Sequence, residues 1–306
     1  MVSNNKIQQL TEEIVRLKKE RNAVILSHVY QQPEVQDIAD FVGDSLGLAQ
    51  QAARTDASVI VFCGVHFMAE SASILCPDKT VVLPDENAGC PMADMVNEVE
   101  LQGKKKEIPD AIVVCYINTS AAVKAECDIA CTSANAVNVI SSLPKNRPIL
   151  FVPDKNLGHY IASKTGRDLI IWDGFCNTHN CLTADDILIA KGAHPGAPVL
   201  VHPECRPEVV ALADVVTSTT GMIRYARESN ASEFIVGTEM GILHALNKQC
   251  PDKQYYLASD KLVCPNMKKI TMEKVHRALL NLEPRVDVPR EIRDRAVRCL
   301  DRMLAI

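Results

Sequence analysis

Three of the twelve cysteines stand in similar surroundings at nearly even intervals along the chain. Cys90, Cys176 and Cys264 lie 86 and 88 residues apart, within the segments DENAGCPM, WDGFCNTH and SDKLVCPNM. Three thiolates that converge on one point could hold a metal centre, although structural zinc and [4Fe–4S] clusters usually take four protein ligands. A cluster held by only three cysteines keeps one iron open, and that iron can act as a Lewis acid on a substrate.

Other cysteines compete for this role. Cys127 and Cys131 are spaced CxxxC, and Cys181 lies close to Cys176. Cys127 and Cys131 have no counterparts at matching positions elsewhere in the chain. We interpret them as structural, together with the other cysteines outside the pattern, such as Cys63, Cys76, Cys250 and Cys299.

Polar residues repeat along the chain at similar intervals. When the runs AVILSHVY (23–30), AIVVCYIN (111–118) and PVLVHPE (198–204) are superimposed, residues align without gaps at spacings of 88 and 86. The aligned sets are His28, Tyr116 and His202; Tyr30, Asn118 and Glu204; Asp40, Asp128 and Asp214; and Ser45, Ser133 and Thr219. A repeat of this length indicates three copies of one structural unit.

The elements that position these residues follow from the apolar runs. Each unit carries three short, almost continuous apolar runs separated by helical stretches such as PEVQDIADFVG and SLGLAQQAA, which is the pattern of a buried parallel sheet. The sequence predicts three small three-layer α/β domains with pseudo-threefold symmetry around a central site. Their expected bounds are 1–91, 92–178 and 179–306. Helices are expected at 6–21, 92–103 and 183–191, with C-terminal helices near 272–282 and 288–304 that pack back on the first domain.

The carboxyl ends of the strands are the expected location of the site, because ligands of open α/β sheets bind there. The aligned His, Tyr, Asn and Glu residues follow the first strand of each unit, and each cysteine follows the third. We predict N-cap and anion-binding roles for Ser45, Ser133 and Thr219. Glu204 is the only carboxylate at its aligned position, and we expect burial to raise its pKa as suits a general base.

The composition excludes several classes of protein. The formal net charge is −5, whereas a nucleic-acid partner requires a basic face. No apolar stretch reaches the roughly 20 residues that span a bilayer. The N-terminal segment predicts an amphipathic helix and not a signal peptide. We therefore expect a cytoplasmic protein with reduced thiols, no nucleic acid and no membrane.

The motifs that carry these residues resemble those of the quinolinate synthase A family over nearly the whole chain. They include SHVYQ, GVHFMAE, LPDENAGCPM, CYINTSAAVKAECDI, VPDKNLG, WDGFCNTH, VHPEC, STTGM, GTEMG and CPNMK. The resemblance implies a transferase of NAD biosynthesis with one [4Fe–4S] cluster per chain, held by three cysteines. It also implies iminoaspartate and dihydroxyacetone phosphate as substrates, with quinolinate, phosphate and water as products. An aspartate oxidase or dehydrogenase would supply the iminoaspartate.

The resemblance also implies roles for individual residues. The cluster ligands would be Cys90, Cys176 and Cys264. The catalytic residues would be Glu204, Tyr30, His28 and His202. Substrate binding would involve His28, Ser45, Tyr116, Asn118, Ser133, His179, His202, Glu204, Ser218 and Thr219. The segment YYLASDKLV before Cys264 lacks the additional cysteines of some family members, so a disulfide role is not transferred.

Three alternatives remain open at this point. An aconitase-like hydro-lyase would use the same open iron. An iron–sulfur carrier would need neither the paired His, Tyr, Asn and Glu residues nor an open iron. A sugar- or amino-acid-binding protein would contain no metal, so the colour of the anaerobically purified protein would distinguish it.

Overall fold

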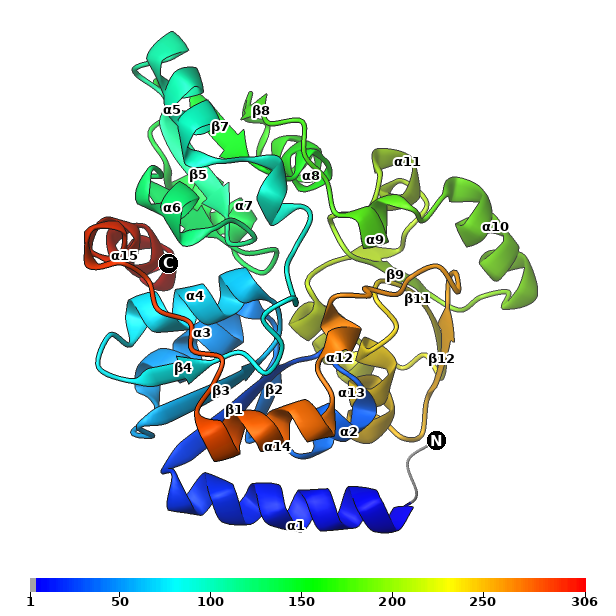
Figure 1. Cartoon of the computed structure of the whole chain (residues 1–306). Coiled ribbons are helices and arrows are strands. Elements are labelled where there is room, and N and C mark those ends of the chain that lie inside the picture. The colour runs from blue at the N-terminus through cyan, green and yellow to red at the C-terminus, as the bar shows by residue number, and fades with distance from the viewer. Residues whose placement is uncertain (1–3) are drawn as a thin grey trace.

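A computed structural model describes residues 4–306 and contains three parallel four-stranded sheets, one after another along the chain (Figure 1). The strands are β1 (Ala23–His28), β2 (Phe41–Gly43), β3 (Val59–Cys63), β4 (Thr80–Val82), β5 (Ile112–Tyr116), β6 (Ile129–Cys131), β7 (Ile149–Val152), β8 (Ile170–Ile171), β9 (Val199–Val201), β10 (Val215–Val216), β11 (Glu233–Gly237) and β12 (Gln254–Leu257). The orders β2-β1-β3-β4, β6-β5-β7-β8 and β10-β9-β11-β12 are the same order three times. This confirms the predicted class of three similar α/β units.

Helices connect the strands and cover the sheets. They are α1 (Asn4–Glu20), α2 (Pro33–Asp37), α3 (Ser45–Arg54), α4 (His66–Leu75), η1 (Ala93–Met95), α5 (Glu98–Glu107), α6 (Ala121–Ala125), α7 (Ala136–Ser142), α8 (Lys155–Thr165), α9 (Asn177–Asn180), α10 (Ala184–Ala193), α11 (Pro207–Val210), α12 (Thr219–Glu228), α13 (Ile242–Gln249), η2 (Met267–Lys269), α14 (Met272–Asn281) and α15 (Arg290–Leu304). The inner strands β3 and β5 are buried along their whole length, as their runs of Val and Ile predict.

Three aligned aspartates fix the start of each sheet. Asp40, Asp128 and Asp214 each accept a hydrogen bond of 2.8 Å from a backbone N–H early in the first strand of their own unit. The donors are Ile25, Val113 and Val199. Each contact holds the residues after the aspartate beside the strand, where they form the short edge strands β2, β6 and β10.

The sequence missed these edge strands, because two or three residues are too few to give a periodic signal. The stretch PEVQDIADFVG was predicted to be helical, but helix α2 ends at Asp37 and Phe41–Gly43 pairs with β1. The helix predicted at 92–103 was also misplaced. Residues Ala93–Met95 form the separate turn η1, and α5 begins after Asn97, whose side chain accepts from the N–H of Glu100 at 2.9 Å.

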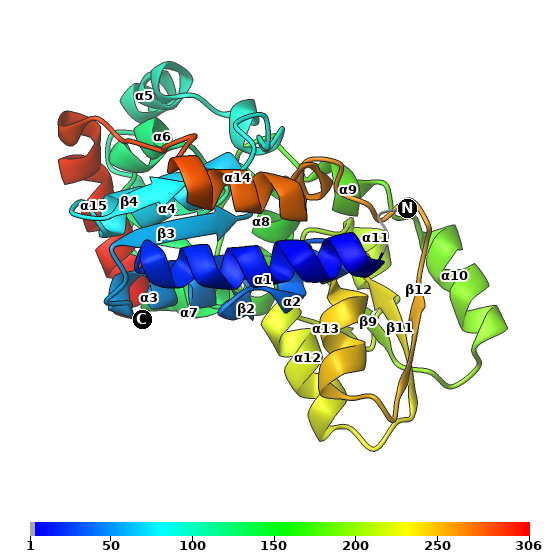
Figure 2. The ribbon, with the colours of Figure 1, turned by 60° about the horizontal axis from the view of Figure 1, so that its bottom comes forward.

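The last two helices join parts of the chain that are distant in sequence. Helix α14 packs against α1 and β3, while α15 packs against α6, β6 and α4 (Figures 1 and 2). Beyond α14 the chain pairs with the edge strand β4: Leu83 donates its N–H to Pro284, and Val286 donates to Val81. The C-terminal segment therefore lies against the first sheet and also bridges to the second.

One large apolar core includes residues of all three sheets and of the C-terminal helices, and a smaller core lies within residues 182–262. Of the helices described for residues 4–306, none is both long and apolar enough to cross a membrane.

Candidate active site

A cavity lies where the three sheets meet, at the carboxyl ends of their strands. Strand β1 ends at His28 and β5 at Tyr116, while His202 directly follows β9; all three side chains line the cavity. The same cavity is lined by nearly all the other site residues named from the sequence: Tyr30, Ser45, Cys90, Asn118, Ser133, Cys176, His179, Glu204, Thr219 and Cys264.

Ser218 is the one named residue that the structure does not place on this lining. Its hydroxyl is the N-cap of α12 and accepts a hydrogen bond of 3.2 Å from the N–H of Gly221. The predicted caps are thus displaced by one or two positions. Asp44 caps α3 through the N–H of Gly47, Asn135 is the N-cap residue of α7, and the hydroxyls of Ser45, Ser133 and Thr219 are not the capping groups.

The three cysteines of the repeat reach the cavity from three different loops. Cys90 follows β4, Cys176 follows β8, and Cys264 follows β12, and all three are free thiols. Burial raises the pKa of Cys90 to about 12 and raises the pKa of Cys176 and Cys264 as well. A bound cation would favour their thiolate forms, because thiolates are the form that ligates metals.

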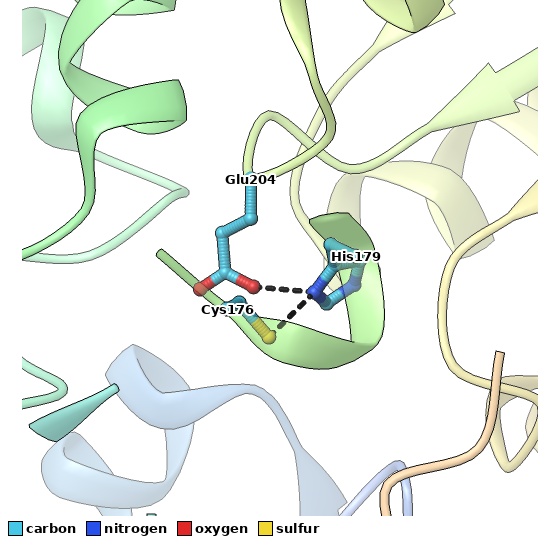
Figure 3. A group of neighbouring side chains, drawn as sticks. All are labelled: Cys176, His179 and Glu204. Atoms are coloured by element: carbon cyan, nitrogen blue, oxygen red, sulfur yellow. Dashed lines mark hydrogen bonds and ion pairs between the residues drawn. The ribbon is translucent and has the colours of Figure 1, made fainter. Parts of the chain in front are cut away.

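Glu204 lies at the centre of a buried polar cluster (Figure 3). Its Oε2 is 2.6 Å from Nδ1 of His179 and 3.4 Å from Nδ1 of His202, and all three side chains are at most 5% exposed. Nδ1 of His179 also lies 3.2 Å from the sulfur of Cys176. The ligand atoms of Cys176, His179 and Glu204 lie within 4.8 Å of one another, so these residues could hold a single metal ion.

The charge state of Glu204 differs from the prediction. Burial alone would raise its pKa, but the two neighbouring histidines outweigh burial and hold the pKa of Glu204 well below its usual value. The expectation of a raised pKa was therefore wrong. Sequence position showed that Glu204 would be buried but did not show that His179 would lie against it.

A chain of hydroxyl and imidazole groups leads from Glu204 to Tyr30. Nε2 of His179 lies 2.8 Å from Oγ1 of Thr238, which is 2.5 Å from the phenol oxygen of Tyr30. Thr238 is fully buried and was not identified from the sequence, although it belongs to the motif GTEMG. Burial, reinforced by the charge of Glu204, raises the pKa of Tyr30 and keeps its phenol protonated.

Two further groups are prepared to bind a ligand. Burial, with a smaller influence of the neighbouring His202, lowers the pKa of His28 to about 3, so its imidazole is neutral. Nδ1 of His28 accepts from the N–H of Tyr30 at 3.2 Å, which leaves Nε2 to donate. Within the part of the chain that the structure describes, the buried Oδ1 of Asn118 has no hydrogen-bond partner. Such a group normally finds a partner, and a bound ligand would supply one.

The comparisons with known proteins agree with one another. The family model described as "Quinolinate synthetase A protein" matches residues 12–305. The chain is 59% identical to the quinolinate synthase of Desulforudis audaxviator over 298 residues, which cover 97% of this chain and 98% of that protein. It is 58% identical to the quinolinate synthase of Methanoregula boonei and 56% identical to that of Methanosarcina barkeri, with 97% of this chain and 98% of each relative covered. This chain belongs to the quinolinate synthetase A family.

Proposed function

We propose that this chain is a quinolinate synthase. It condenses iminoaspartate with dihydroxyacetone phosphate and releases quinolinate, phosphate and water, as a step of NAD biosynthesis. The observation that carries this proposal is the meeting of one cysteine from each unit at a single cavity, which is also lined by His28, Tyr30 and Glu204. The family membership of nearly the whole chain supports the same activity.

The cysteines fit a three-cysteine [4Fe–4S] cluster. Cys90, Cys176 and Cys264 are free, line one cavity and would hold three of its irons. When bound, the cluster supplies a Lewis acid at its open iron. A single metal ion at Cys176, His179 and Glu204 would use only one of the three cysteines, so metal and sulfide analysis distinguishes the two sites.

The polar residues fit substrates that carry two carboxylates and one phosphate. His28 offers a neutral N–H donor, and the hydroxyls of Ser45, Ser133 and Thr219 face the same cavity. In this proposal the hydroxyls bind the anionic groups, while Asn118 and Tyr116 orient the substrates.

Proton transfer is assigned to Glu204 and to the side chains that connect it with Tyr30. Its carboxylate is held ionised by the histidines and is therefore available to accept a proton, although its lowered pKa makes it a weaker base than the raised pKa expected from the sequence would have made it. The contacts from His179 through Thr238 to Tyr30 connect this base with a protonated phenol on another side of the cavity. Acid and base groups then serve the isomerisation of the triose phosphate and the later loss of water. Nε2 of His202 lies 3.1 Å from Oγ of Ser133, so in this proposal a substrate oxygen replaces one of these two groups as the partner of the other.

The domain boundaries, the cellular location and the source of iminoaspartate are proposed as well. We propose unit boundaries at 1–91, 92–178 and 179–306, and a cytoplasmic location. Iminoaspartate is unstable in water, so an aspartate oxidase or dehydrogenase would supply it nearby.

The test is anaerobic purification and reconstitution, followed by iron and sulfide analysis and an assay for quinolinate. Cys90→Ala, Cys176→Ala and Cys264→Ala should each lose the cluster and the activity. Cys63→Ser and Cys131→Ser should keep both, because these buried thiols do not line the cavity.

Two results would contradict the proposal. Iron that is retained by Cys90→Ala and lost by Cys131→Ser would show that the ligands are misassigned. A full cluster without quinolinate formation would favour a hydro-lyase or a carrier.

A further inference from the structure

The loop before each of the three cysteines is tied to its own unit in the same way. In each unit, a backbone N–H just beyond the third strand in chain order donates to the carbonyl two residues before the cysteine, at 2.8, 2.8 and 2.9 Å. The pairs are His66 with Ala88, Lys155 with Gly174, and Met240 with Leu262. This contact fixes the path of the chain but leaves open how the cysteine itself is held.

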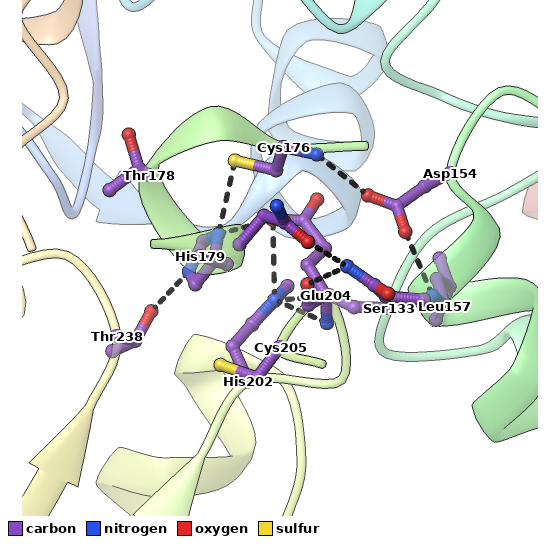
Figure 4. Close-up of polar contacts among 12 residues, drawn as sticks. Ser133, Asp154, Leu157, Cys176, Thr178, His179, His202, Glu204, Cys205 and Thr238 are labelled. Atoms are coloured by element: carbon purple, nitrogen blue, oxygen red, sulfur yellow. Dashed lines mark hydrogen bonds and ion pairs between the residues drawn. The ribbon is translucent and has the colours of Figure 1, made fainter. Parts of the chain in front are cut away.

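In the second unit, a buried carboxyl group, whose pKa burial and the charge of Glu204 raise well above its usual value, contacts the cysteine directly (Figure 4). Asp154 is fully buried and lies two residues beyond β7. Its Oδ2 accepts from the N–H of Cys176 at 3.2 Å, and its Oδ1 accepts from the N–H of Leu157 at 2.8 Å. The carboxyl group therefore joins the cysteine loop to the first turn of α8.

In the third unit, Glu239 occupies the same position, two residues beyond β11, and is also fully buried. Its Oε1 accepts from the N–H of Cys264 at 3.1 Å, and its Oε2 accepts from the N–H of Gly241 at 2.7 Å. The ammonium group of Lys268, four residues after the cysteine, lies 2.9 Å from Oε1. Glu239 thus holds both sides of the cysteine loop.

The first unit has an apolar residue at this position. Val65 lies two residues beyond β3, is 3% exposed and offers no acceptor to Cys90. Val65 is the N-cap of α4 without a side-chain cap, so the fold forms without an acid at this position, whereas Asp154 also caps α8. Buried carboxyl groups are costly, and their presence beside two of the three cysteines calls for a role at those loops.

We propose that Asp154 and Glu239 are positioning residues that hold Cys176 and Cys264 in place to bind the cluster, whereas the loop of Cys90 is held, among residues 4–306, by backbone contacts. The inference rests on the proposed function, because it assigns these cysteines to a cluster. Groups that orient metal ligands in this way affect metal affinity by about 10–100-fold.

The test uses Asp154→Asn and Glu239→Gln, which preserve size but remove one of the acceptor oxygens. The control is Asp128→Asn, which alters an exposed acid that accepts a 2.8 Å bond from Val113 at the opposite end of a strand of the second sheet. Each protein is reconstituted anaerobically, and the rate of iron loss to a chelator is measured without substrate. Circular dichroism and thermal unfolding of the cluster-free proteins report on folding.

We expect Asp154→Asn and Glu239→Gln to lose iron about 10–100-fold faster than the wild type. The control Asp128→Asn should lose iron at the wild-type rate, even if its unfolding temperature falls by as much as that of Asp154→Asn or Glu239→Gln. Because the two variants lie in different units, either one that folds decides the question.

Wild-type rates in the folded variants, or equal acceleration in Asp128→Asn, would overturn this inference and leave the proposed function intact. A wild-type protein that takes up no iron and sulfide would overturn both.

Discussion

Glu204 combines full burial with a carboxylate that stays ionised. Its Oε2 lies 2.6 Å from Nδ1 of His179. This close contact offsets the free-energy cost of removing the carboxylate charge from water. The aligned residues Tyr30 and Asn118 carry no carboxylate, so the threefold repeat presents one carboxylate and two neutral groups. Asymmetry of this kind allows three similar loops to bind chemically different parts of the substrates.

Glu204→Gln should lower turnover by about 10²–10⁴-fold, because the amide keeps the shape of the side chain but accepts no proton. The variant should still bind its full cluster and quinolinate. Turnover is measured by quinolinate formation, and product binding by calorimetry under anaerobic conditions.

Glu208→Gln is the matched control, because the side chain of Glu208 is half exposed and pairs only loosely with Arg206. It should turn over at the wild-type rate. Near-normal turnover of Glu204→Gln would transfer the role of base to Tyr30 or a histidine.

At the residue scale, the repeat alone located the cysteines and the residues at the strand ends. Thr238 was not predicted as a site residue, because a threonine after a strand does not by itself indicate a function. Its place in the site comes from its contacts with both Tyr30 and His179. The direction of the Glu204 pKa shift depends on how closely His179 and His202 pack against its carboxylate, and spacing does not encode such contacts.

At the element scale, helix starts decide which hydroxyls are free for a ligand. Helices α3 and α12 begin at Ser45 and Thr219, one residue later than the caps Asp44 and Ser218. Either residue of such a pair has a capping type, so the sequence does not distinguish cap from neighbour. The short edge strands were missed because their position is set by a contact at a distance. Asp40 and its equivalents accept hydrogen bonds from another strand, and the local sequence does not show this contact.

Ser45→Ala, Ser133→Ala and Thr219→Ala should each weaken the binding of substrate or product about tenfold or more, because a hydrogen bond to a charged group contributes about 1.5–3 kcal/mol. The cluster content should not change. Binding is measured by anaerobic calorimetry.

Ser218→Ala provides the contrast. Loss of this cap should cost about 1 kcal/mol of stability, with product affinity unchanged. Unchanged affinity in all three cavity variants would refute the anion-binding role, and weaker affinity in Ser218→Ala would extend that role to the cap.

At the scale of the whole molecule, Glu126 connects α15 to the second unit. Its side chain is 8% exposed and accepts from Gln102 and Lys105 of α5 at 2.9 and 3.2 Å, and also from Arg295 of α15. Burial alone would raise the pKa of Glu126, but these donors outweigh burial and lower it. The folded state therefore favours the carboxylate.

A lowered pKa gives a contribution to stability that is complete above the unfolded value of about 4.3 and is lost as pH falls through the folded value. Glu126→Gln should therefore reduce the free energy of unfolding by about 1 kcal/mol at pH 7, and this difference should shrink in acid. Urea unfolding of the cluster-free proteins at several pH values measures it.

The control Glu107→Gln changes an exposed acid on α5 that pairs with its neighbour Lys104 on the same helix, so it should show no comparable trend. A Glu126→Gln difference that grew as pH fell would contradict the direction of the pKa shift.

The contact between β4 and the chain beyond α14 has a consequence for synthesis on the ribosome. Strand β4 emerges early, but its outer edge stays unpaired until Pro284 and Val286 arrive. An unpaired strand edge can pair with another chain, and domains that are only partly folded are prone to aggregate. Pro284 and Val286 follow all twelve strands in the chain, so the outer edge of β4 is covered only after the strands of all three sheets have been synthesised.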